Sequence, residues 1–156
     1  MIVSFEAKKV LNDIPVTADI KLYYENTIAS ITKKIKSESV IDQIEAIVIP
    51  EDFVSAVIDF QEKQHDPYPS VTNNEFGRAY GKILFNTETG KHVVYLDSMI
   101  AAFIMEDKVL SACFGALGEN GIESAKKTRN LSLNLLTHEL SHVELAQKLP
   151  RPQAEK

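Results

Sequence analysis

Residues 122–149, IESAKKTRNLSLNLLTHELSHVELAQKL, contain neither glycine nor proline, and Pro150 follows them. Because both residue types interrupt helices, their absence predicts one long helix. With about 100° of rotation per residue, the apolar residues fall on two opposite faces, one of which carries two histidines. The histidine-bearing face consists of Leu131, Leu135, His138, His142, Leu145 and Leu149. The opposite face consists of Leu133, Leu136, Leu140 and Val143. The pattern predicts a helix that is buried on two sides.

The rest of the chain predicts a mixture of helices and strands before this helix. We expect a helix over 17–37, a strand over 44–50, a helix over 51–64, a loop over 65–74, a β-hairpin over 78–97 with its turn at 86–90, and a short helix over 98–106. Three glycines within 114–121 indicate a break before the long helix. The sequence therefore predicts an α+β fold, with a small, mostly antiparallel sheet packed by helices.

Length and composition narrow the choice of domain number and partners. The chain has 156 residues, of which 44% are hydrophobic, and this favours one domain over 1–149, with 150–156 as a tail or the start of a further segment. The net charge of -5 and the lack of a dense basic cluster argue against nucleic acid as a partner. No apolar stretch approaches the roughly 20 residues that cross a membrane. The single cysteine and the absence of a recognisable secretory leader predict a cytoplasmic location.

His138, Glu139 and His142 predict a metal centre on the long helix. Two histidines four residues apart lie on one helix face, where their ring nitrogens can bind the same ion. Glu139 projects toward the flank of that face, where its carboxylate can reach a water molecule on the metal. A metal ion acidifies such a water, and a carboxylate can take the proton and later return it to a leaving amine. These residue types at this spacing predict a hydrolytic site.

The sequence His138-Glu139-Leu140-Ser141-His142 matches the HExxH motif. In this motif and its setting the chain resembles the zincin metallopeptidases, specifically minimal domains of the gluzincin type. The resemblance covers the second half of the chain, where a predicted hairpin precedes the motif helix. It implies Zn²⁺ as the cofactor, His138 and His142 as zinc ligands, and Glu139 as general base and acid. It also implies a peptide or protein substrate that lies extended along the edge of the sheet.

A catalytic zinc ion needs a third protein ligand, which the sequence leaves open. The metzincin extension would place a glycine and a histidine where this chain has Leu145 and Lys148. In gluzincins the third ligand is a glutamate on a later helix. Glu144 points about 200° away from His142 around the helix, and Glu155 lies close to the last residue of the sequence. Both glutamates are therefore weak candidates.

Upstream candidates for the third ligand or for the cleft are few. Cys113 invites a comparison with peptide deformylase, in which an earlier cysteine joins an HExxH helix, but the sequence around Cys113 lacks the motif of that family. We expect Cys113 to be a buried structural thiol. His92 is a possible ligand or substrate contact, although a surface position on its strand is expected. His65 is expected to be solvated, and Tyr95 and Asp97 are candidates for the cleft, with a core position as the alternative for Tyr95.

The predicted function is that of a zinc-dependent hydrolase, specifically a peptidase. Metal-activated water would attack a peptide carbonyl, with Glu139 as the general base. The alternative from another class is a non-catalytic interaction or regulatory domain, or a truncated fragment, with an incomplete metal site. A purely structural interpretation treats His138 and His142 as core histidines bonded to backbone carbonyls, with Glu139 at the surface.

Overall fold

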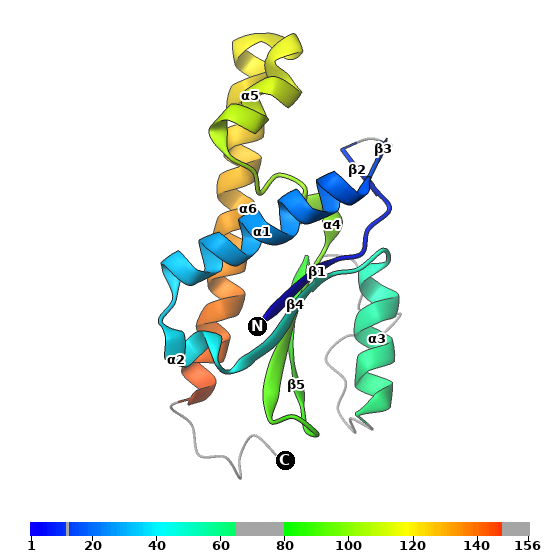
Figure 1. Ribbon diagram of the computed structural model, residues 1–156, viewed down its shortest axis with the longest axis vertical. Helices are drawn as coiled ribbons and strands as arrows, with labels where there is room; N and C mark the ends of the chain where they lie inside the picture. The colour runs from blue at the N-terminus through cyan, green and yellow to red at the C-terminus, as the bar shows by residue number, and fades with distance from the viewer. Residues whose placement is uncertain (12, 65–79, 148–156) are drawn as a thin grey trace.

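A computed structural model describes residues 1–11, 13–64 and 80–147. The predicted loop at 65–74 and the segment 150–156 lie outside the described residues, as do His65 and Glu155. The centre of the fold is a four-stranded sheet (Figure 1). In spatial order its strands are β1 (Ile2–Phe5), β4 (Ile44–Ile49), β6 (Lys91–Leu96) and β5 (Gly81–Asn86). A separate two-stranded ribbon consists of β2 (Lys9–Val10) and β3 (Ile14–Pro15).

Two of the three strand pairings in this sheet are parallel. Strand β4 runs parallel to both β1 and β6, and only the edge strand β5 is antiparallel to its neighbour β6. The prediction of a mostly antiparallel sheet is therefore wrong. The hairpin was predicted from a local pattern, whereas β1 pairs far along the chain, with Ile2 opposite Ala46. The dense apolar sequence of β4, with three isoleucines at 0% exposure, is typical of a parallel strand covered on both faces.

The helices confirm part of the sequence pattern and extend it. They are α1 (Ala18–Ile35), α2 (Glu38–Ile41), α3 (Phe53–Lys63), α4 (Ser98–Ala101), α5 (Asp107–Phe114), a 3₁₀ turn η1 (Gly115–Leu117) and α6 (Gly118–Gln147). Helices α1 and α3 begin where expected, because Thr17 and Asp52 cap them by accepting hydrogen bonds from the backbone N–H groups of Ile20 and Ser55. None of the described helices combines the length and apolar character needed to cross a membrane.

Two helix predictions need correction around the long helix. The expected helix over 98–106 ends at Ala101, and a separate helix, α5, follows it. The long helix begins at Gly118 rather than at Ile122, since Gly121 is helical and Gly118, with a φ of 78°, makes the break. Glycine is suited to that conformation because it has no Cβ.

The sheet separates two apolar clusters. The main core lies between the sheet and the helices α1 and α6, whereas α3 covers the other face with a smaller cluster of Phe53, Val57 and Leu84. Figure 1 shows α3 on the side of the sheet opposite α1 and α6, and it shows α5 and the first half of α6 extending beyond the sheet. Only the second half of α6 therefore packs against the strands.

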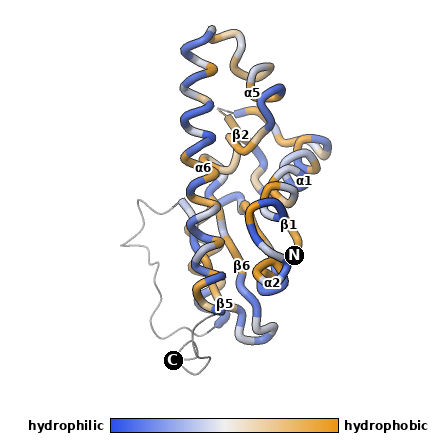
Figure 2. The backbone as a smooth tube through the Cα atoms, turned by 90° about the vertical axis from the view of Figure 1, so that its left-hand side faces the viewer, coloured by the Kyte–Doolittle hydropathy of each residue, from blue (hydrophilic) through white to orange (hydrophobic). Residues whose placement is uncertain are grey.

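The long helix is buried on one side only. Its buried residues are Ala125, Ser132, Leu136, Glu139, Leu140 and Val143. On the histidine-bearing face, Leu131 is 65% exposed and Leu145 is 55% exposed, and both histidines are exposed as well. In Figure 2, hydrophilic and hydrophobic residues alternate along α6. The prediction that both faces are buried is wrong, because on the described part of the histidine-bearing face Leu135 alone is partly buried, next to the start of β5.

Candidate metal centre

The second half of α6 holds the motif residues in a fixed orientation. Leu136, Leu140 and Val143 are all 0% exposed and anchor this part of the helix in the main core. Because side-chain directions on a helix follow from the backbone, anchoring one face also fixes where the other face points. The imidazoles of His138 and His142 therefore point outward, away from that core.

The two histidine rings approach each other closely on this exposed face. Their Nε2 atoms are 3.1 Å apart, and the ring planes are inclined at 86°. Two nitrogens that bind one tetrahedral zinc ion, at bond lengths of about 2.0–2.1 Å, lie about 3.3 Å from each other. The same separation also suits a hydrogen bond in which one Nε2–H donates to the other Nε2. The separation of the two nitrogens is thus compatible with a shared zinc ion and with a direct hydrogen bond between the rings.

Glu139 differs from the histidines in being buried. Glu139 is only 6% exposed. It lies at the border between the core-facing side of α6 and the side that carries the exposed histidines. Burial raises the pKa of Glu139, and the opposing effect of nearby positive charge, first from His142, is smaller. The structural interpretation with core histidines and a surface Glu139 is therefore wrong. A carboxylate with a raised pKa beside two imidazoles is suited to accept a proton.

The described residues bring two of the predicted ligands together and do not supply the third. Within 1–11, 13–64 and 80–147, no group of three or more His, Cys, Asp and Glu side chains is arranged to hold a metal ion. Glu155, a candidate from the sequence, falls outside these ranges. The donor set available for zinc in the described part of the chain is thus the histidine pair.

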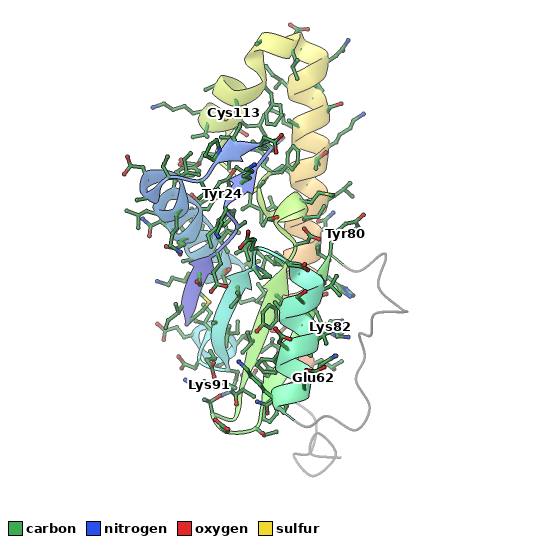
Figure 3. All side chains as sticks on the ribbon, turned by 90° about the vertical axis from the view of Figure 1, so that its right-hand side faces the viewer. Tyr24, Glu62, Tyr80, Lys82, Lys91 and Cys113 are labelled. Atoms are coloured by element: carbon green, nitrogen blue, oxygen red, sulfur yellow. The ribbon has the colours of Figure 1, made fainter. Side chains whose placement is uncertain are left out.

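Cys113 is exposed, so the expectation of a buried thiol is wrong. It lies on α5, whose first residue, Asp107, pairs with Arg129 of α6. Arg129 is nine residues before His138, which corresponds to about 13 Å along a helix. Figure 3 shows Cys113 at the end of the molecule formed by α5, well separated from Lys82 on the edge strand. Cys113 therefore does not belong to the candidate metal centre, and the comparison with peptide deformylase fails.

His92 is 9% exposed, so its expected surface position on β6 is also wrong. Its ring lies edge-on to the ring of Phe85 on the neighbouring strand, with 5.1 Å between the ring centroids. These two residues are directly opposite each other in the β5–β6 ladder. His92 is thus packed within the sheet and does not join the histidine pair.

Tyr95 and Asp97 have structural contacts away from the motif. Tyr95 packs edge-on against Phe60 of α3, so it belongs to the small cluster on the face of the sheet opposite α6. The Asp97 carboxylate caps α4 by accepting a hydrogen bond of 2.9 Å from the backbone N–H of Met99. Of the two possibilities raised for Tyr95, the core position is confirmed.

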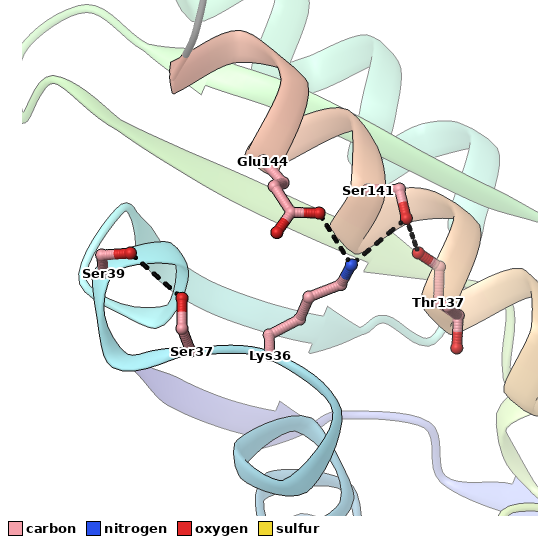
Figure 4. A network of polar contacts seen from close by, with 6 residues as sticks. All are labelled: Lys36, Ser37, Ser39, Thr137, Ser141 and Glu144. Atoms are coloured by element: carbon pink, nitrogen blue, oxygen red, sulfur yellow. Dashed lines mark hydrogen bonds and ion pairs between the residues drawn. The ribbon is translucent and has the colours of Figure 1, made fainter.

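Glu144 is engaged on the other side of the helix by Lys36, from the segment that follows α1 (Figure 4). The Lys36 ammonium donates to Glu144 Oε1 at 3.1 Å and to Ser141 Oγ at 3.4 Å. Ser141 in turn donates to the backbone carbonyl of Thr137. This network keeps Glu144 away from the histidines and ties α6 to the start of α2. No local pattern in the sequence points to Lys36, because its partner is 108 residues away.

Comparisons of this chain with protein-family models, with curated proteins and with solved structures found no match. The resemblance to zincins thus rests on the HExxH residues themselves and on the geometry described above.

Proposed function

We propose that this chain is a zinc-dependent peptidase, with His138 and His142 as metal ligands and Glu139 as the general base. The observation that carries the proposal is the exposed histidine pair, with its Nε2 atoms 3.1 Å apart, beside a buried glutamate. Two exposed imidazoles leave the metal position open to a large substrate. A glutamate whose pKa is raised by burial supports proton transfer at the same place.

Each residue has a defined task in the proposed reaction. His138 and His142 would hold the zinc ion, which would supply the Lewis acidity that lowers the pKa of water. The Glu139 carboxylate removes a proton from the attacking water as its oxygen adds to the carbonyl carbon of the peptide. Glu139 then gives this proton to the nitrogen as the C–N bond breaks. The raised pKa of Glu139 favours its temporary protonation.

The edge of the sheet offers a place for the substrate. Among the described residues, strand β5 pairs with β6 on one side and has no partner strand on the other, and it is also the strand that reaches α6 at the motif. An extended peptide can add to such an edge through backbone hydrogen bonds. We therefore propose an unfolded or extended protein segment as the substrate.

The test is hydrolysis of an unstructured, dye-quenched protein such as casein in the presence of Zn²⁺. Glu139→Gln keeps the shape of the side chain but removes the base, so we expect a loss of about 10²- to 10⁴-fold in rate. Glu144→Gln is the matched control, because this glutamate is on the same helix but pairs with Lys36. A chelator should abolish the activity. Cleavage that survives Glu139→Gln contradicts the mechanism.

A second candidate is a non-catalytic interaction or regulatory domain that retains the helix but holds zinc weakly. It is favoured by one observation, namely that the described residues contribute two ligands rather than three. A domain of this kind would show no hydrolysis with added zinc, and Glu139→Gln would leave its behaviour unchanged.

A further inference from the structure

The edge strand β5 touches the motif helix at a glycine. Gly81 is the first residue of β5 and lies opposite Leu96 of β6. A Cβ atom on residue 81 would lie 3.2 Å from Cγ of Glu139 and 3.3 Å from Cγ of Leu135. Both distances are shorter than the roughly 3.5–4.0 Å of an ordinary carbon–carbon contact. A Cβ at residue 81 would therefore require these side chains of α6 to shift by a few tenths of an ångström.

The conformation of the backbone does not explain this glycine. Among the glycines in the described part of the chain, Gly90 and Gly118 have a positive φ, whereas Gly81 does not. A glycine inside a strand otherwise weakens it, because the residue loses more backbone freedom on folding and packs no side chain. The reason for glycine at this position is therefore space for the side chains of α6.

We propose that Gly81 is a positioning residue for Glu139, an inference that rests on the proposed function. The side chain of Glu139 has several rotatable bonds, and it is held only if its methylene groups are packed. The missing Cβ of Gly81 leaves the space in which Cγ of Glu139 lies, and this position of Cγ directs the carboxylate at the end of the side chain. An added methyl group displaces Cγ by a few tenths of an ångström and turns the carboxylate away from the histidine pair. Displacements of this kind reduce catalysis without removing a catalytic group.

Gly81→Ala is the first variant, and Gly115→Ala is its matched control, because a Cβ at Gly115 meets nothing within 4 Å. With zinc and dye-quenched casein, we expect Gly81→Ala to lower kcat by about ten- to a hundredfold with KM and zinc content close to those of the wild type. Gly115→Ala should leave both constants unchanged. A folded Gly81→Ala protein that cleaves like the wild type overturns the proposal.

A second experiment tests the contact without using activity. Urea unfolding midpoints are measured for the wild type, Gly81→Ala, Glu139→Ala and the double variant. Gly81→Ala should lower the midpoint when Glu139 is present, and this loss should be at least halved when the Glu139 side chain is truncated. Equal losses in both backgrounds overturn the proposal. If the wild type with zinc does not cleave at all, the proposed function fails, and this cycle alone decides whether Gly81 controls the Glu139 side chain.

Discussion

The two faces of α6 contain similar residues in opposite environments. Leu136 and Leu140 are 0% exposed, whereas Leu131 and Leu145, on the same helix, are 65% and 55% exposed. The first pair holds the helix on the sheet. The second pair flanks the two histidines on a face that is mostly exposed. Leucine spacing therefore shows that a helix has two apolar faces, but the position of the sheet decides which one is core.

Glu139 lies at the border between these two faces. On the buried side its Cγ lies close to Gly81, and on the exposed side its neighbours are the candidate zinc ligands. A base at this border is desolvated enough for its pKa to rise and still close to an open surface. The buried face thus holds α6 on the sheet, and the exposed face leaves the candidate site accessible.

The largest effect is expected when equivalent leucines on the two faces of α6 are truncated and the loss of stability is compared. Leu140→Ala removes a fully buried side chain from the main core, so it should lower the free energy of unfolding by about 2–5 kcal/mol. Leu145→Ala makes the same chemical change on the exposed face and should change it by less than about 0.5 kcal/mol. Urea unfolding of both variants measures the difference. Similar losses would mean that the histidine-bearing face is also packed.

A smaller effect on stability is expected when the ion pair between Lys36 and Glu144 is removed. Lys36→Met retains most of the aliphatic stem but removes the charge that binds Glu144, and the side chain of Lys36 is only 12% exposed. The side chain of Glu144 is 42% exposed. A double-mutant cycle that combines Lys36→Met with Glu144→Gln should therefore give a coupling energy of about 0.5–1 kcal/mol. A coupling of zero would show that this contact does not help to hold α6.

The buried carboxylate predicts a pH dependence with a definite sign. The pKa of Glu139 in the folded protein is raised above its ordinary value of 4.5. Between these two values the folded protein binds more protons than the unfolded chain, so this residue reduces stability as the pH rises through that window. Glu139→Gln should therefore gain stability relative to the wild type as the pH increases from below 4.5 toward neutral. Unfolding midpoints at several pH values test this, and a pH-independent difference would contradict it.

The smallest effect on stability is expected when a histidine of the pair is replaced in the metal-free protein. Both rings are exposed, so His138→Ala in the presence of a chelator should change the free energy of unfolding by less than about 0.5 kcal/mol. Thermal or urea unfolding provides the value. A loss above about 1 kcal/mol would mean that the His138 ring is packed against other side chains. His138 would then not differ from the buried Leu140 in the way described.

The sequence allowed the motif helix and the hairpin to be predicted, because both depend on local patterns. The glycine-free segment after Gly121 and the turn at Asn86–Gly90 are signals of this kind. The parallel pairing of β1 with β4 could not be predicted in the same way, since it joins distant segments such as those of Ile2 and Ala46.

The limits of prediction at the candidate site have the same origin. The identities and spacing of His138, Glu139 and His142 came from the sequence. Their burial did not, because the angle around a helix gives relative directions and not the position of the sheet. Ser132 belongs to the buried face, although it is polar and so is not part of the apolar pattern. Its hydroxyl donates a hydrogen bond to the backbone carbonyl of Ile100. The contact between Gly81 and Glu139 depends on the packing of two elements and has no local pattern.

The most direct test of the account is the metal content of the protein purified without added metal. Elemental mass spectrometry would be applied to the wild type and to the His138→Ala/His142→Ala variant under the same conditions. We expect zinc close to one equivalent in the wild type and its loss in the double variant. Absence of zinc from both proteins, or equal zinc in both, would contradict the claim that the exposed histidine pair is a zinc site.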